Sequence, residues 1–191
     1  MASELQVTTI RGVPTGANAN QIVVPSGQTL AAPGHILQVQ QTYYQTQATY
    51  STNANFNDVT ELNCSITPKL ATSKILVTIN FNYSTSNNGC GHGLSLSREV
   101  NGVTTNHIAR GVGGTTADVW IGMDNNYGQA NSSGIVNNSC GNFLDSPNTT
   151  STIIYKPLLY LINGASPIKM NRSDGGQIGA ASTLTLMEIA Q

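Results

Sequence analysis

The chain has 191 residues, of which 39% are hydrophobic and only 9% are charged, and its formal net charge is −1. This length suits one well-cored domain with an additional segment, and the near-zero net charge argues against intrinsic disorder. Eight Lys and Arg residues are scattered along the chain, so there is no basic cluster for a nucleic acid. No apolar run approaches the roughly 20 residues of a membrane-spanning helix. The N-terminus also lacks the features of a signal peptide, so we expect synthesis in a cytoplasm.

Residues 1–33 are predicted to form an extended N-terminal arm or neck that serves attachment or trimerisation. Two short apolar runs in this segment are separated and followed by Pro/Gly turns. Two such short strands cannot bury enough apolar area to be stable alone, so we expect the arm to pack on another protein. A mobile terminus is the alternative. The candidate anchors of the arm are Leu5, Val7, Ile10, Ile22 and Val24.

Residues 34–191 are predicted to form a globular head made of strands. Apolar residues alternate with polar ones over residues 37–44 and 62–66, and a single helical turn is expected near residues 57–60. The clearest strand covers residues 75–83, where five apolar side chains fall on one face and Thr78, Asn80 and Asn82 on the other. A period of two over this length favours a strand over a helix. Cys64, within the second of these runs, is expected to be a small core side chain.

The second half of the chain continues the pattern with short strands and turn signals. Asn101-Gly102 is a strong hairpin signal between two such strands. Pro157 interrupts a long apolar run and predicts an edge strand, a bulge or two strands there. Further strands are predicted at residues 94–100, 103–108, 119–123, 135–136, 151–162, 168–170 and 181–189. Up to ten short strands separated by turns predict a sandwich or barrel. We expect an all-β fold, a jelly-roll-like β-sandwich.

Residues able to carry chemistry are few, and none stands in a recognisable motif. The chain has no G-x-S-x-G sequence and no phosphate-binding loop. Cys90 and His92 could supply two metal ligands, with Cys140 and His107 completing a site, but the second closely spaced pair of a structural zinc site is missing. A glycine-rich turn is the favoured interpretation of that run. We therefore predict no catalytic residue, no metal and no cofactor, and leave open whether Cys90 and Cys140 form a disulfide.

Three long polar segments, at residues 84–93, 111–118 and 124–134, are the candidate binding loops. Loops cluster at the ends of a sandwich, and amide and hydroxyl groups with an occasional tyrosine suit contacts with sugars or with another protein. Plain connecting loops are the alternative. The candidate contact residues are Asn87, Asn88, His92, Thr115, Asn125, Asn126, Tyr127 and Asn131.

Three stretches carry a resemblance to a known family. They are residues 25–39, which contain Pro25-Ser26-Gly27 and Ala32-Pro33-Gly34, residues 65–77, and the ending at residues 181–189. Together they resemble virion structural proteins of tailed phages, especially phages of cyanobacteria and marine bacteria. The resemblance covers less than a quarter of the chain. It implies trimers with β-sandwich heads that act as tail fibre, receptor-binding tip or capsid decoration, and it supplies no catalytic residue.

The resemblance leads to the expectation of a homotrimeric short tail fibre that contacts the host surface. A single neck-like Pro-Ser-Gly segment excludes a long shaft. The expected partners are other copies of the chain, tail, baseplate or major capsid proteins bound through the arm, and a host surface glycan, within a virion assembled after synthesis in the host cytoplasm. Neither nucleic acid nor membrane insertion is expected. Capsid decoration at local three-fold positions is the alternative, and a glycan-degrading enzyme is a more distant one.

Overall fold

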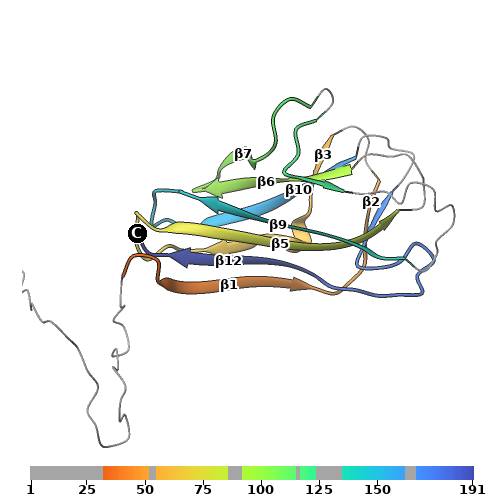
Figure 1. The fold of residues 1–191 in the computed structure, drawn as a ribbon, viewed down its shortest axis with the longest axis horizontal. Helices are drawn as coiled ribbons and strands as arrows, with labels where there is room; N and C mark the ends of the chain where they lie inside the picture. The colour runs from red at the N-terminus through yellow and green to blue at the C-terminus, as the bar shows by residue number, and fades with distance from the viewer. Residues whose placement is uncertain (1–31, 52–54, 86–91, 115–116, 124–134, 162–166) are drawn as a thin grey trace, which may run out of the picture.

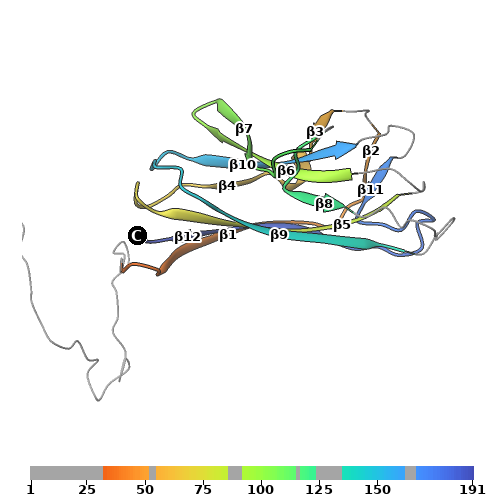
Figure 2. The ribbon, with the colours of Figure 1, turned by 45° about the horizontal axis from the view of Figure 1, so that its top comes forward.

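The structure is a computed structural model that describes residues 32–51, 55–85, 92–114, 117–123, 135–161 and 167–191. Within these ranges the chain forms strands and one short 3₁₀ helix, arranged as two facing sheets (Figure 1; Figure 2). No helical segment of the described chain has the length and apolarity to cross a membrane. The predicted all-β sandwich is confirmed. The predicted arm lies almost entirely outside the described residues.

The first sheet, sheet A, has β1 at one edge, β12 and β5 in the middle and β9 at the other edge, and all pairs are antiparallel. The short strands β2 and β11 continue the positions of β1 and β12 along the far part of β5. The bounds of these strands are β1 Ile36–Tyr44, β2 Ala48–Tyr50, β5 Lys74–Thr85, β9 Asn137–Asp145, β11 Ile168–Met170 and β12 Ser182–Ile189.

The second sheet, sheet B, has β10 and β6 at its centre. β3 and β4 share one side of β10, while β7 and β8 share the outer side of β6. The bounds are β3 Phe56–Asp58, β4 Cys64–Ile66, β6 His92–Val100, β7 Val103–Ala109, β8 Ile121–Met123 and β10 Ile153–Leu161, with the 3₁₀ helix at Thr60–Leu62.

The order of strands within the two sheets is that of a jelly roll. If β1 and β2, β3 and β4, β7 and β8, and β11 and β12 are each taken as one interrupted strand, the described chain has eight strands. Sheet A then contains the first, eighth, third and sixth in space, and sheet B the second, seventh, fourth and fifth. Eight antiparallel strands in two such interleaved sheets define the jelly-roll architecture, as expected from the sequence.

The core lies between the sheets and follows the predicted alternation. On β5, the inward side chains Ile75, Val77, Ile79, Phe81 and Tyr83 are all at most 1% exposed. They face buried residues of sheet B, including Leu94, Leu96, Tyr155 and Leu159. Cys64 is 5% exposed and belongs to this cluster, as predicted.

Two local predictions need correction. The helical turn expected near residues 57–60 begins only at Thr60, because β3 extends to Asp58 and pairs there with β10. Residues 135–136 are not a strand, since β9 begins at Asn137. In both cases the pairing partner sets the element boundary, and a partner distant in sequence leaves no local signal.

Pro157 lies in the middle of β10, which is a single central strand. β10 pairs with β6 from residue 153 to residue 161 without interruption. On its other side, the Pro157 carbonyl accepts a hydrogen bond from the backbone N–H of Val59 (2.9 Å). Because the N–H and C=O of one strand residue point to the same side, the missing N–H faces the gap between β3 and β4. It costs no hydrogen bond with β6, so the prediction of an edge, a bulge or two strands is wrong.

The β6–β7 hairpin turns at Asn101-Gly102, as predicted, with φ of 50° and 77° at these two residues. We expect Gly102→Ala to lower the free energy of unfolding by about 1 kcal/mol, since a Cβ disfavours the left-handed conformation. The matched control is Gly122→Ala, because an added Cβ meets nothing within 4 Å at either position and only Gly102 has a positive φ. Urea unfolding of both variants checks this. Equal losses of stability would contradict the conformational explanation.

Candidate interaction surfaces

Different segments of the chain lie at the two ends of the sandwich. At one end, here called the arm end, the backbone N–H of Gly34 donates to the carbonyl of Ala190 (2.8 Å), and the N–H of Ala190 donates to the carbonyl of His35 (2.9 Å). The segment that follows the predicted arm therefore lies beside the C-terminus (Figure 1). The first described residues and the last residues of the chain thus share one end of the head.

The opposite end, here called the loop end, is where the strands that flank two of the three candidate loops, residues 84–93 and 124–134, terminate. The flanks of the third, Ala109 and Ile121, lie beside the middle of β6. Strand pairing aligns the strand ends at the loop end within each sheet. They are Tyr50, Thr85 and Ile168 in sheet A and Phe56, His92, Met123 and Leu161 in sheet B. The connections through residues 52–54, 86–91, 124–134 and 162–166 start and finish there. Jelly-roll topology thus brings to one end the described strand ends that flank four connections distant in sequence.

Most of the predicted contact residues belong to these connections and lie outside the described residues. This applies to Asn87, Asn88, Asn125, Asn126, Tyr127 and Asn131. Thr115, between β7 and β8, is also outside the described chain, as are the arm anchors Leu5, Val7, Ile10, Ile22 and Val24.

His92 is described, and its place differs from the predicted loop. It begins β6 and is 5% exposed, because the alternation of the strand puts it on the same inward face as Leu94 and Leu96. Neither ring nitrogen has a hydrogen-bond partner. Burial lowers the pKa of His92, so the imidazole is neutral at neutral pH. With this burial, the His92 side chain offers little surface to an external ligand.

Ser95 and His107 form a Ser–His contact that the sequence did not suggest. Their Oγ and Nδ1 atoms are 3.0 Å apart, and Ser95 Oγ also donates to the carbonyl of Ala109 (3.1 Å). A serine has one hydroxyl proton, so when both bonds form, His107 Nδ1 donates to Ser95. A nucleophile needs the opposite direction, with the imidazole accepting the proton. Ser95 is also 0% exposed, so the contact is structural.

The described residues of the alternative metal site, His92, His107 and Cys140, do not form such a site. The described residues contain no group of three His, Cys, Asp or Glu side chains placed to hold a metal ion. Cys140 is an exposed free thiol on β9, and Cys90 lies outside the described residues.

A buried charge cluster at the arm end joins the two sheets. Asp145, the last residue of β9 in sheet A, is 7% exposed. Both of its carboxylate oxygens accept hydrogen bonds from Arg98 of β6 (2.8 and 2.7 Å), and one accepts from the hydroxyl of Tyr155 of β10 (2.7 Å). Burial and the nearby carboxylate raise the pKa of Tyr155, so the hydroxyl stays a donor. This cluster fixes β9 against sheet B.

A second buried carboxylate, Glu188 of β12, is fully enclosed at the same end. It accepts hydrogen bonds from Gln38 Nε2 (2.6 Å) and from the backbone N–H groups of Lys69 (2.7 Å) and Leu70 (3.2 Å). Burial by itself would raise the pKa of Glu188, but these hydrogen bonds outweigh it and lower the pKa below its ordinary value. Glu188 thereby holds the turn after β4 against the edge of sheet A.

The outer face of sheet A carries an apolar row that crosses all four strands. Val39 of β1 pairs with Met187 of β12, Met187 with Leu76 of β5, and Leu76 with Leu144 of β9. We call these four residues the apolar row. Val39 is 52% and Leu144 is 49% exposed. The neighbouring pair of Ile36 and Ile189 extends the row toward the arm end.

Polar residues of the same face, on the loop-end side of the apolar row, bond to one another across the strands. Thr78 Oγ1 donates to Asn142 Oδ1 (2.9 Å), and Gln41 Nε2 donates to Thr185 Oγ1 (2.8 Å). Asn138 Nδ2 donates to the side-chain oxygens of Asn80 and, at 3.1 Å, of Asn82. Much of the hydrogen-bonding capacity of this face is therefore satisfied within the chain.

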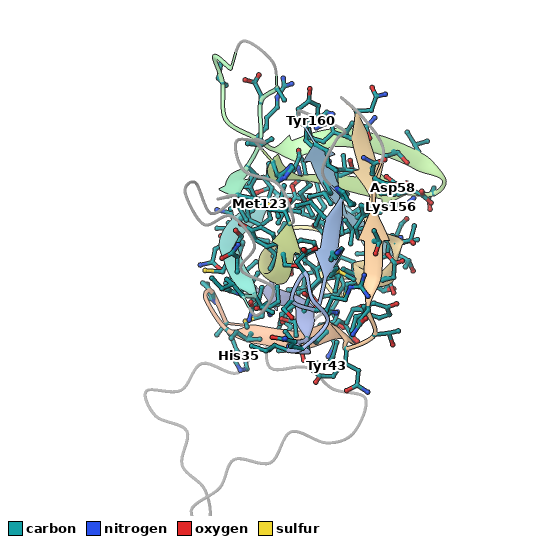
Figure 3. The ribbon with its side chains drawn as sticks, turned by 90° about the vertical axis from the view of Figure 1, so that its right-hand side faces the viewer. His35, Tyr43, Asp58, Met123, Lys156 and Tyr160 are labelled. Carbon is teal, nitrogen blue, oxygen red and sulfur yellow. The ribbon has the colours of Figure 1, made fainter. Side chains whose placement is uncertain are left out.

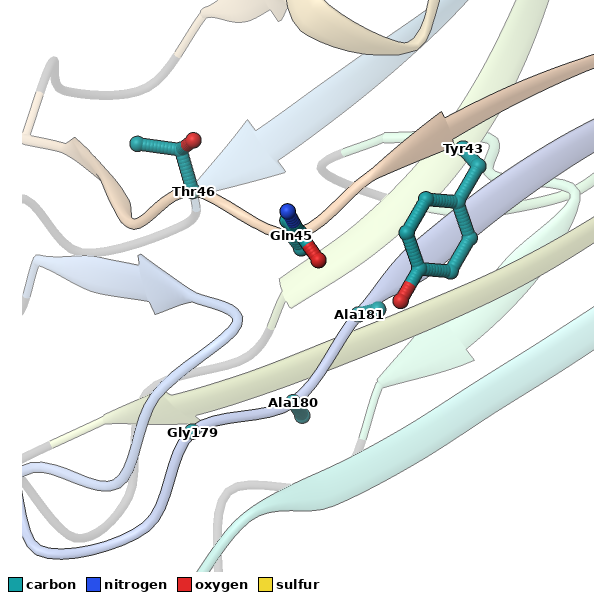
Figure 4. A pocket seen from close by; sticks show the side chains of 6 residues that line it. All are labelled: Tyr43, Gln45, Thr46, Gly179, Ala180 and Ala181. Atoms are coloured by element: carbon teal, nitrogen blue, oxygen red, sulfur yellow. The ribbon is translucent and has the colours of Figure 1, made fainter.

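A shallow, open recess of about 670 Å³ lies at the β1 edge of this face (Figure 4). Tyr43 stands beside it with 60% of its surface exposed, and Figure 3 shows His35 and Tyr43 on the side of the molecule opposite Tyr160. No charged side chain lines the recess; its lining residues are Tyr43, Gln45, Thr46, Gly179, Ala180 and Ala181.

No family model and no curated protein matches this chain. Among solved structures, it is similar to the infectious bursal disease virus Gx strain, with 11% identity and a TM-score of 0.37 over 88% of this chain and 46% of that chain. It is also similar to the T13 particle of that virus (12% identity, TM-score 0.40, 91% and 41% covered) and to its VP2 subviral particle (12%, 0.36, 97% and 49%). The chain spans less than half the length of each of these chains. Likeness at this level transfers no function, and the jelly-roll assignment rests on strand order and register.

Proposed function

We propose that this chain is a non-enzymatic structural subunit of a virus particle. Its N-terminal arm, residues 1–33, attaches it to the particle, and its head presents the loop end to the host surface. The observation that supports this proposal is that the two ends of the head differ. The described chain begins beside its own C-terminus at the arm end, while the strand ends that flank two of the three candidate loops lie at the opposite end. Attachment and contact are thereby separated by the length of the sandwich.

Other features agree with this proposal. Jelly rolls recur in virion and lectin domains, although a fold by itself does not imply a function. Ser95, which contacts His107, is fully buried and offers a substrate no access. A chain with 9% charged residues also suits contact with identical neighbours, since polar contacts avoid the desolvation of buried charge.

Within this function, we favour a homotrimeric short tail fibre that contacts host surface glycans over a capsid decoration protein. The arm would then bind tail or baseplate proteins, and in the decoration role it would bind the major capsid protein. Quantitative mass spectrometry of purified particles distinguishes the two roles, since a fibre is present in tens of copies per particle and a decoration protein in hundreds. Absence of the chain from purified particles would refute the virion role altogether.

A competition assay tests the contact with the host. Purified full-length protein added to host cells before infection is expected to reduce particle adsorption if the head binds a receptor. Released soluble sugar would instead indicate a glycan-degrading enzyme. Unchanged adsorption at saturating protein would contradict the fibre role and leave decoration as the virion function.

A further inference from the structure

We propose that the outer face of sheet A is the interface between three copies of the chain, arranged around a three-fold axis that runs along the strands. This deepens the proposed function, on which its biological setting rests, by assigning trimer contacts to named residues. The three arm ends then lie together at one end of the trimer and the three loop ends at the other.

The apolar row supplies the attraction. Val39, Met187, Leu76 and Leu144 form an unbroken line from one edge of the sheet to the other. On a solvated face, alternation normally leaves polar side chains outward. Burying this row and the adjacent Ile36 and Ile189 removes apolar surface from water. Each Å² of apolar surface buried stabilises the trimer by about 25 cal/mol.

The charge pattern of the two sheets favours another copy of this face as the occupant. Along the four strands β1, β12, β5 and β9, the outward positions carry one charge, Lys74, which lies in the last register row at the arm end beside Ile189. The outer face of sheet B, by contrast, carries the ion pair of Glu99 and Lys156. Lys169 of β11, outward beside Ser84 at the loop end of sheet A, is ion-paired with Asp174. A face with one unpaired charge per copy meets copies of itself with little like-charge repulsion, and Lys74 at the end of the face can stay in water.

Many polar side chains of this face already form hydrogen bonds with one another, which lowers the cost of burying them. The bonds from Thr78 to Asn142, from Gln41 to Thr185 and from Asn138 to its two asparagine neighbours use side-chain groups that would otherwise lose water without a partner. A buried polar group costs free energy mainly when it has no hydrogen-bond partner. Burying these bonded pairs therefore costs less free energy than burying unpaired amides.

The width of the sheet suits three copies. Four strands spaced about 4.8 Å apart make a face about 19 Å wide. Stacked sheets lie about 10 Å apart, so the side chains of each sheet fill about 5 Å of that distance. A triangle with sides of about 19 Å has its centre about 5.5 Å from each side. Three such faces therefore enclose a filled interior, and the edge strand β1 of one copy meets β9 of the next, which covers both open edges.

The test compares two interface variants with one matched control. Val39→Glu and Leu144→Glu place a charge on half-exposed positions of the face, so the single chain should still fold. Val103→Glu is the control, because Val103 is 70% exposed on β7, away from sheet A. Light scattering after size exclusion should give three times 20.1 kDa for the wild type and the control, and a single-chain mass for both interface variants with unchanged circular dichroism.

Alkylation of Cys140 provides a second measurement, since this exposed thiol lies on the same face, in register with Asn80. Peptide mass spectrometry should show it reacting at least tenfold more slowly in the wild type than in Leu144→Glu. A monomeric or dimeric wild type, or a trimer that survives both substitutions, would overturn the interface. Those results leave particle association untouched, whereas absence from particles would overturn the proposed function and leave the interface standing.

Discussion

Asp145→Ala should lower the free energy of unfolding by about 3 kcal/mol, because it leaves a buried cation without its partner. Asp145 accepts both hydrogen bonds of Arg98 and the hydroxyl of Tyr155. Removing one member of a buried ion pair costs roughly 3–5 kcal/mol, and the low end applies here since the Arg98 side chain keeps 20% of its surface exposed. Against a typical stability of about 5–15 kcal/mol, this is a large fraction.

Urea unfolding at fixed protein concentration, followed through the fluorescence of Trp120, measures this loss. Trp120 is the single tryptophan and packs edge-on against Phe143 of β9, with ring centroids 6.4 Å apart. It therefore reports on the strand that Asp145 holds.

Two comparisons identify the cause of the loss. Glu99→Gln breaks the partly exposed ion pair with Lys156 and should leave the unfolding midpoint almost unchanged, since such pairs contribute little. The double variant Asp145→Leu with Arg98→Met should lose less than Asp145→Ala, because it removes the unpaired charge as well. A double variant less stable than the single one would refute this account.

Glu188→Gln should lower stability at neutral pH by about 2 kcal/mol, in the range for hydrogen bonds to a charged group. The carboxylate accepts from Gln38 and from the backbone N–H groups of Lys69 and Leu70. A glutamine in its place replaces one of the two accepting oxygens with an NH₂ group, which is itself a donor. At least one of the three bonds from Gln38, Lys69 and Leu70 is then lost.

The same variant should change the response of the protein to acid. The folded-state pKa of Glu188 is below its ordinary value of 4.5, so its contribution is complete above about pH 4.5 and is lost as the pH falls through the lowered pKa. The stability difference between wild type and Glu188→Gln should therefore narrow below pH 4.5. Unfolding free energies measured from pH 7 to pH 3 check this. A difference that is constant or grows in acid would show that the lowered pKa does not stabilise the fold.

The sequence allowed most of the strands and the fold class to be predicted, because side-chain alternation and turn chemistry are local. It did not predict β9, whose polar sequence carries no clear apolar alternation. The period of two over β5 identified its buried face, and Asn101-Gly102 located the β6–β7 turn. Those signals depend on residues two to four positions apart, and the chain carries them without reference to its partners. The number of short strands and turns predicted a sandwich or barrel, and the expected jelly-roll type is confirmed by the strand order that only the structure supplies.

The sites were less accessible to sequence reasoning. His92 looked like a loop residue because glycines surround it, but its register with Leu94 and Leu96 carries it into the core. The Ser95–His107 contact forms only because β7 folds back onto β6. Asp145 and Glu188 are single acidic residues whose donors come from other strands, so nothing near them in sequence marks them as buried.

The sequence by itself determined most of the strands, with β2, β3 and β9 as exceptions, and the inward face of the clearest one, β5. Only the tertiary structure decided which strands are neighbours, and with that the composition of the outer surface. Val39, Leu76, Leu144 and Met187 are single apolar residues at outward positions of four separate strands, and each by itself is unremarkable. They become one continuous row because antiparallel register places distant segments side by side, and register is a property of pairs of strands that no single segment encodes.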